Sequence, residues 1–144
     1  IAIGQGEVTA TPLQIANLGA TIANRGYFIT PHVVKEIEDG EMESQFSEKR
    51  YTKVRKEHYE TVVQGMRAAV TGGTCRAANI PGLDVCGKTG TAQLGKGANN
   101  AVFIAFAPFD NPQIAVAVVL EHGVRGTNAG RVARDVFDRY FFGI

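Results

Sequence analysis

The chain has 144 residues, of which 44% are hydrophobic and 20% are charged, which is ordinary for a globular domain. Its 15 Lys and Arg residues balance 14 Asp and Glu residues, so the sequence shows no electrostatic signature of a nucleic-acid-binding or anionic-membrane-binding protein. The longest apolar runs, at 101–107 and 114–120, are too short to span a bilayer, and the start at Ile1 without a methionine leads us to expect a piece of a longer protein.

Two helices are predicted in the first half of the chain. After a Gly-containing loop at 1–9, Thr11-Pro12-Leu13-Gln14 offers a capping threonine, a proline at the first helical position and a glutamine that completes a capping box. This helix is apolar over most of its circumference and ends at Asn24-Arg25-Gly26, so we expect it to be largely buried. A second helix is predicted over residues 56–70, and its core-facing residues are Tyr59, Val62, Val63, Met66, Ala69 and Val70.

Between the two helices the sequence predicts a small acidic hairpin. Residues 33–38 have the composition of a strand and lead into Asp39-Gly40, which is a strong hairpin-turn signal. The acidic residues of this segment are Glu36, Glu38, Asp39, Glu41 and Glu43. We interpret the hairpin as a solvent-exposed insertion without a function, and residues 44–53 after it as a polar connector.

The last third of the chain predicts three antiparallel strands, at 83–93, 101–109 and 113–121. A Gly-rich turn joins the first two, and Asp110-Asn111-Pro112 joins the last two, a connection short enough to make them antiparallel neighbours. A final helix is predicted over 129–142, capped by Thr127 or Asn128, with an apolar stripe of Val132, Val136, Phe137, Tyr140 and Phe141. The fold class is therefore α+β, with the last helix packed on the sheet.

The first of these strands carries the motif Gly87-Lys88-Thr89-Gly90-Thr91-Ala92-Gln93. Strand alternation places Lys88 and Gly90 on one face and Thr89 and Thr91 on the other. The motif thus offers a cation, two hydroxyls and, at Gly90, a backbone that another group can approach closely. Such a strand can bind an anionic or peptide-like ligand along a sheet edge.

A nucleotide-binding interpretation competes for the same residues, because Gly82-x4-Gly87-Lys88-Thr89 matches the phosphate-loop pattern. That loop requires a helix that begins at the Lys-Thr pair, and the glycines that follow make a helix start unfavourable there. A non-catalytic module that binds a ligand or a protein is a further alternative.

Four motifs in order resemble the bacterial class B penicillin-binding proteins, most closely the elongation-type peptidoglycan transpeptidases. They are Gly4-Gln5-Gly6-Glu7, Thr11-Pro12-Leu13-Gln14, the Lys-Thr-Gly segment at 87–93, and Ala105-Phe106-Ala107-Pro108. The resemblance covers nearly the whole chain. It implies a penicillin-binding-protein and serine-β-lactamase-like fold, in which a Ser-x-x-Lys nucleophile, a Ser-x-Asn and a Lys-Thr-Gly converge on one cleft.

The resemblance also implies an activity and a set of roles. The family's serine attacks a D-alanyl-D-alanine stem peptide and passes the acyl group to an amine, and β-lactams stall at the acyl stage. Lys88 would be the catalytic residue that supplies charge to proton transfer, while Thr89, Gly90 and Thr91 would bind the substrate, with the two hydroxyls on the ligand carboxylate. The Thr91 backbone N–H would be one of two oxyanion donors.

The surroundings that the resemblance implies are those of a cell-wall enzyme. We expect no cofactor and no metal. The expected partners are peptidoglycan stem peptides, β-lactams and cell-wall elongation proteins. The parent protein would be anchored by an N-terminal transmembrane helix at the periplasmic face of the inner membrane.

The chain departs from the family pattern in its serines. It has only two, Ser44 and Ser47, and neither begins a Ser-x-x-Lys or a Ser-x-Asn. We therefore expect residues 1–144 to be the C-terminal portion of a transpeptidase domain, inactive alone. The strand at 113–121 pairs in the family with an earlier strand, so we expect an exposed edge here and self-association.

The two cysteines, Cys75 and Cys86, do not have the spacing of a zinc site. They are either two buried free thiols or a disulfide, since connectivity cannot be deduced from sequence. Cys86 lies two residues before Lys88 and is expected to share its face of the strand, which makes it a poor substitute nucleophile.

Overall fold

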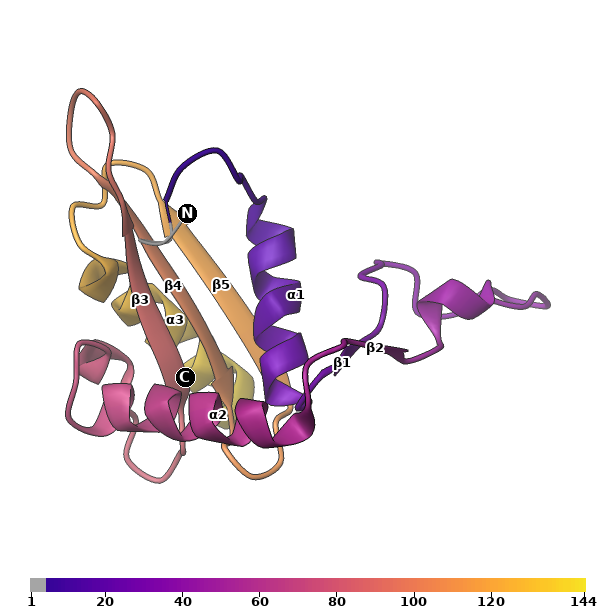
Figure 1. Ribbon diagram of the computed structural model, residues 1–144. Coiled ribbons are helices and arrows are strands. Elements are labelled where there is room, and N and C mark those ends of the chain that lie inside the picture. Colours follow the sequence, from indigo (N-terminus) through magenta and orange to yellow (C-terminus); the bar gives the residue numbers. More distant parts are fainter. Residues whose placement is uncertain (1–4) are drawn as a thin grey trace.

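The computed structural model describes residues 5–144, so Gly4 of the first family-like motif and the start of the predicted N-terminal loop lie outside the described residues. Three helices surround one three-stranded sheet, and a small two-stranded sheet lies beside it (Figure 1). The elements in chain order are α1 (Pro12–Ala23), β1 (Tyr27–Phe28), β2 (Arg50–Tyr51), α2 (Lys56–Thr71), β3 (Cys86–Ala92), β4 (Asn100–Ala107), β5 (Ile114–Leu120) and α3 (Gly126–Phe142). The predicted α+β class is confirmed. No described helix is long and apolar enough to cross a membrane.

The central sheet has the strand order β3-β4-β5 and is antiparallel throughout, as predicted. Its strands are shorter than predicted, because Leu83 forms only an isolated bridge with Ile80 before β3 begins at Cys86. Short connections join neighbouring strands and fix their register. Strands β3 and β4 pair from Cys86↔Phe106 to Ala92↔Asn100, and β4 and β5 pair from Ala101↔Leu120 to Ala107↔Ile114. Since β4 is central, β3 and β5 are the two edges.

The core consists of two apolar clusters, one on each face of this sheet. On one face, α3 packs on β4 and β5, and Phe103 and Phe137 are fully buried there. On the other face, α1 packs mainly on β5 and α2 on β3, where Val63, Met66 and Phe106 are buried together. Full burial of one such side chain contributes roughly 1.5–3 kcal/mol, so the sheet is held firmly between two helical layers.

Helix α1 begins as the sequence predicts and is buried less than expected. The Gln14 N–H donates to Thr11 Oγ1 at 3.3 Å, and the Thr11 N–H donates to Gln14 Oε1 at 2.8 Å, so the capping box is complete. Leu13 and Leu18, however, are 62% and 54% exposed. The reason is that only one side of α1 meets the sheet, while the opposite side has no neighbouring layer in the described structure.

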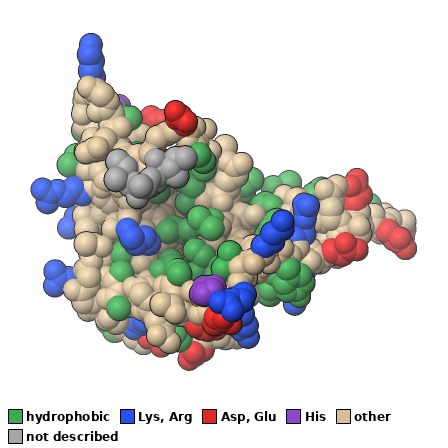
Figure 2. Space-filling model, in the orientation of Figure 1, with side chains coloured by type: hydrophobic (Ala, Val, Ile, Leu, Met, Phe, Trp, Pro, Cys, Tyr) green, Lys and Arg blue, Asp and Glu red, His purple; other side chains and the backbone are tan. Residues whose placement is uncertain are grey.

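The prediction of an acidic β-hairpin between the first two helices is wrong. Residues 33–38 form no strand, although the turn at Asp39 exists, with φ 55° and a hydrogen bond from the Gly40 N–H to the Ile37 carbonyl. The segment between β1 and β2 projects from the body, with acidic side chains toward its tip (Figures 1 and 2). Val33 is fully exposed, which shows why strand propensity fails here: within the described residues the segment has neither a pairing strand nor a layer to pack on.

Helices α2 and α3 confirm the predicted positions but not every predicted contact. In α2, Tyr59, Val63, Met66 and Val70 are buried as expected, while Val62 is exposed. Helix α3 starts three residues early, at Gly126, with Arg125 at the N-cap, so neither Thr127 nor Asn128 is the cap.

The buried face of α3 is also not the predicted stripe. Ala129, Gly130, Ala133 and Phe137 face the sheet, whereas three of the five stripe residues, Val132, Val136 and Tyr140, are between 38% and 54% exposed. A Cβ at Gly130 would lie 3.3 Å from the Phe103 ring, so at this point the helix approaches too closely for a large residue to face the sheet. Small residues therefore decide which side of α3 is buried.

Candidate active site

The Lys-Thr-Gly motif lies on β3, at the free edge of the central sheet. Lys88 pairs with Ile104 and Gly90 with Val102, on the face covered by α1 and α2. Thr89 pairs with Phe103, on the α3 face. The predicted alternation is confirmed, and among residues 5–144 no strand pairs with the alternate backbone groups on the outer edge of β3.

The position of Lys88 contradicts the nucleotide-binding interpretation. Lys88 and Thr89 lie in the middle of a strand, and Gly82 lies in a turn with φ 82°. A phosphate loop needs both residues at a helix N-terminus. The phosphate-loop match is therefore coincidental.

Lys88 is exposed and its ammonium group donates to the carbonyl oxygen of Thr89 at 2.6 Å. Within residues 5–144, no carboxylate lies at ion-pairing distance from it. A cation bonded only to a neutral carbonyl keeps most of its charge available for an anion. Lys88 thus presents an unneutralised positive charge beside the open edge of the sheet.

Thr89 is held from outside its own strand. Its hydroxyl lies 3.0 Å from the hydroxyl of Thr74, which belongs to the loop after α2. The first turn of α3 also packs directly against Thr89, because a Cβ on Gly126 would lie 2.8 Å from both Thr89 Cβ and the Gly90 carbonyl oxygen. Sequence reasoning did not identify Thr74 or Gly126, since no local pattern ties either to the motif.

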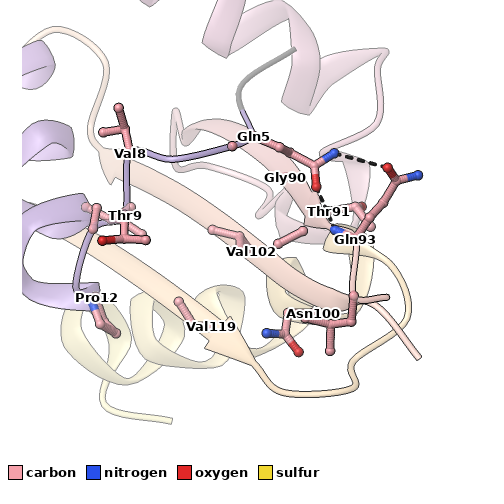
Figure 3. Close-up of a pocket in the computed structure, with 15 residues that line it drawn as sticks. Gln5, Val8, Thr9, Pro12, Gly90, Thr91, Gln93, Asn100, Val102 and Val119 are labelled. Carbon is pink, nitrogen blue, oxygen red and sulfur yellow. Dashed lines mark hydrogen bonds between the residues drawn. The ribbon is translucent and has the colours of Figure 1, made fainter. Parts of the chain in front are cut away.

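A hollow of about 760 Å³ opens beside the motif on the α1 face of the sheet (Figure 3). Gly90, Val102 and Val119 form its floor, and Pro12 and Ile15 of α1 form one wall. Figure 2 shows hydrophobic side chains gathered over the centre of this face. Lys88 and Thr89 are not among the residues that line the hollow, whereas Gly90 and Thr91 are.

The segment before α1 is tied to the end of β3 by Gln5. The Gln93 N–H donates to Gln5 Oε1 at 2.7 Å, and Gln5 Nε2 donates to Gln93 Oε1 at 3.4 Å (Figure 3). These bonds join residues 88 positions apart and satisfy the first backbone donor after the strand. The end of β3 is thereby fixed next to Thr91.

Neither serine of the chain lies at this site, and Cys86 does not face it. Ser44 and Ser47 are exposed on the segment that projects between β1 and β2. Cys86 is fully buried among Val63, Met66 and Phe106, and this burial raises the pKa of its thiol to about 12. It lies on the same face of the strand as Lys88, as predicted, and away from Thr89.

Both cysteines are free and buried, so the disulfide interpretation is wrong and the free-thiol one is confirmed. Among residues 5–144, no group of three or more His, Cys, Asp or Glu side chains could hold a metal ion. The described site consists of one cation, two threonine hydroxyls and the free backbone edge of β3. This arrangement can bind and polarise an anionic or peptide-like ligand, and it includes neither a serine nor an exposed cysteine.

Residues 1–140 match the family model for the penicillin binding protein transpeptidase domain. The sequence is similar to the peptidoglycan D,D-transpeptidase MrdA of Acinetobacter baumannii, with 35% identity over 96% of this chain and 23% of that protein. The chain spans about a quarter of the length of the curated relatives it matches.

Solved structures of similar proteins agree with this match. Penicillin-binding protein A of M. tuberculosis, as an imipenem acyl-enzyme complex, superimposes with a TM-score of 0.80 and 31% identity, over 96% of this chain and 32% of that one. PBP2 of Helicobacter pylori in a complex with MreC also has a TM-score of 0.80, with 27% identity over 99% of this chain and 26% of that one. The expected fold is thus confirmed.

Proposed function

Because this chain belongs to the penicillin-binding protein transpeptidase family, we propose that it forms one wall of the active site of a peptidoglycan D,D-transpeptidase. The reaction is serine acyl transfer on stem peptides that end in D-alanyl-D-alanine, and β-lactams would be trapped at the acyl-enzyme stage. The observation that carries this proposal is the Lys-Thr-Gly strand at a free sheet edge, with the Lys88 charge unneutralised within the described residues.

The geometry suggests a division of labour among the four motif residues. A peptide-like ligand would add along the outer edge of β3 and use its unpaired backbone groups. The hydroxyls of Thr89 and Thr91 would hold the ligand carboxylate, and the Thr91 N–H would serve as an oxyanion donor. Lys88 would be the catalytic residue whose positive charge assists proton transfer. Gly90, which has no side chain, would leave the strand backbone open to the ligand.

We further propose that residues 1–144 form the C-terminal portion of the transpeptidase domain. In this arrangement the Ser-x-x-Lys nucleophile and the Ser-x-Asn come from a part of the protein outside these residues. Two observations support this division: the chain spans about a quarter of its curated relatives, and both of its serines lie in the projecting segment. The chain alone would then bind weakly and would not turn over substrate.

The proposed partners and location follow from the same family. Stem peptides and β-lactams would bind at the β3 edge, and the imipenem acyl-enzyme of the M. tuberculosis relative supports the β-lactam part. Cell-wall elongation proteins would bind the parent protein, which the MreC complex of the H. pylori relative supports. The parent protein would be anchored at the periplasmic face of the inner membrane.

Acylation of the full-length parent by a fluorescent penicillin tests the proposal. The Lys88→Ala variant should lose about 10²-fold or more in acylation rate, because proton transfer loses its fixed charge. The matched control is Lys96→Ala, which removes the same charge from an exposed loop position beyond β3 and should leave the rate unchanged. Equal rates for Lys88→Ala and the wild type would overturn the role of this strand.

A further inference from the structure

The hydroxyl of Thr89 has one close side-chain partner in the described structure, and that partner comes from another element. Thr74 Oγ1 lies 3.0 Å from Thr89 Oγ1, across the gap between the loop after α2 and the outer strand β3. The two residues are 15 positions apart, so chain connectivity does not bring the hydroxyls together. The contact results from how α2 and β3 pack.

The loop that carries Thr74 is held by hydrogen bonds on both sides of this residue. The N–H groups of Gly73 and Cys75 both donate to the Ala69 carbonyl oxygen at 3.0 Å. Cys75 is fully buried, and a Cβ on Gly73 would lie only 2.8 Å from Ala69 Cα. Thr74 itself is exposed, so its backbone is fixed by its neighbours while its side chain stays at the surface beside β3.

Counting protons determines how this pair must act toward an anion. Each hydroxyl has one proton, and the bond between the two uses one of them. A carboxylate accepts protons and donates none, so Thr89 can bind it only if its own proton is free. Thr74 must then donate to Thr89, and Thr89 must donate to the carboxylate.

We propose that Thr74 is a positioning residue that orients the Thr89 hydroxyl to donate its proton to the carboxylate of the ligand. The inference rests on the proposed function, because it takes Thr89 as a residue that binds this carboxylate. The bond from Thr74 favours the Thr89 rotamer that brings its hydroxyl within 3.0 Å of Thr74 Oγ1. Hydrogen bonds in such a series also strengthen one another, most of all when the last acceptor is charged.

The test uses the full-length parent and two ligands, a penicillin and its methyl ester, which lacks the anionic carboxylate. For each variant, the dissociation constant of the non-covalent complex and the acylation rate constant are measured separately. Thr74→Val removes the hydroxyl and keeps the shape of the side chain, and Thr74→Ser restores the hydroxyl. Thr71→Val is the matched control, since Thr71 is a neighbouring exposed threonine whose hydroxyl bonds only to its own helix, at Ala68.

In Thr74→Val, the dissociation constant for the penicillin should rise about tenfold, because Thr89 is no longer oriented to donate its charge-assisted hydrogen bond to the carboxylate. The constant for the ester should change by less than about twofold, and Thr74→Ser and Thr71→Val should behave like the wild type. A Thr74→Val variant that binds the acid as the wild type does would overturn the proposal. An equal loss for acid and ester would also overturn it, because Thr74 would then only tie the loop to the strand.

Failure of the proposed function would give a different pattern. Thr89→Val should raise the dissociation constant for the acid at least as much as Thr74→Val does. If Thr89→Val left acid binding unchanged, or if the wild-type parent formed no acyl-enzyme, the role of this strand in penicillin binding would be refuted, and the role of Thr74 with it. A normal wild type, a weakened Thr89→Val and an unaffected Thr74→Val would refute the Thr74 role alone.

Discussion

Replacing Gly126 by alanine should push the first turn of α3 away from the Lys-Thr-Gly strand. The added Cβ would lie 2.8 Å from Thr89 Cβ and from the Gly90 carbonyl oxygen, and 3.0 Å from the Val102 carbonyl oxygen. Two of these atoms belong to the sheet backbone and the third is attached directly to it. None is the end of a flexible side chain, so the helix or the strand must shift.

The size of the effect follows from two opposed terms. Overpacking by one methyl group in a tight contact costs typically about 1–3 kcal/mol. Alanine regains at most about 1 kcal/mol over glycine through helix propensity, and less at the first helical position. The net loss of unfolding free energy should be about 1–2 kcal/mol, which corresponds to a fall of roughly 3–7 °C in Tm for a chain of this size.

Thermal unfolding followed by circular dichroism measures this difference. Gly65→Ala is the matched control, because Gly65 lies within α2 and a Cβ there would meet nothing within 4 Å. The same chemical change should raise stability by about 0.5–1 kcal/mol at that position. If both variants melted at or above the wild-type temperature, α3 would not begin against β3, and the packing of the site described above would be refuted.

Incubated with a fluorescent penicillin, the 144-residue chain should show no covalent adduct by intact-mass spectrometry, since neither serine lies in a Ser-x-x-Lys; a stoichiometric mass increase would contradict this. Ellman's reagent should modify neither Cys75 nor Cys86 in the folded chain and both after unfolding. Burial raises the pKa of Cys86 from 9.0 to about 12, so between these pH values the folded chain keeps a proton that the unfolded chain loses. The contribution of Cys86 to the free energy of unfolding should therefore be full below about pH 9 and fall as the pH rises toward 12. Cys86→Ala should remove this part of the dependence of the unfolding free energy on pH. Sedimentation at concentrations on the order of 10 µM should show dimers or larger assemblies, because β5 is an apolar edge strand, and a pure monomer would count against that.

The parts of the fold that were predicted correctly depend on local information. The capping box at Thr11 and Gln14 is a contact three residues apart, and the β4–β5 pairing follows from a connection too short for any other arrangement. The errors arise where contacts between segments distant in the sequence determine the structure. Residues 33–38 have strand composition but no partner, and the buried side of α3 is chosen by how closely Gly130 lets the helix approach Phe103.

The candidate site shows the same division more sharply. The alternation of Lys88 and Thr89 could be predicted because it depends only on the two-residue period of a strand. Their supports could not, because Thr74 and Gln5 reach the motif through side-chain bonds between segments 15 and 88 residues apart. No pattern in a single sequence encodes which rotamer a distant threonine or glutamine adopts.

The motif strand is restrained before any ligand arrives, and the restraints come from three separate parts of the chain. Thr74, in the loop after α2, bonds to the Thr89 hydroxyl, and Gly126 lets α3 pack against β3. Gln5 bonds to the backbone of Gln93, just beyond the end of the strand. A site that is ordered in advance pays less conformational entropy when it binds, so its affinity depends on the supports as well as on the contacting groups. Substitutions at Thr74, Gly126 or Gln5 should therefore weaken ligand binding although none of the three residues needs to touch the ligand. Within the described residues no strand pairs with the outer edge of β3, which is why we place the ligand there.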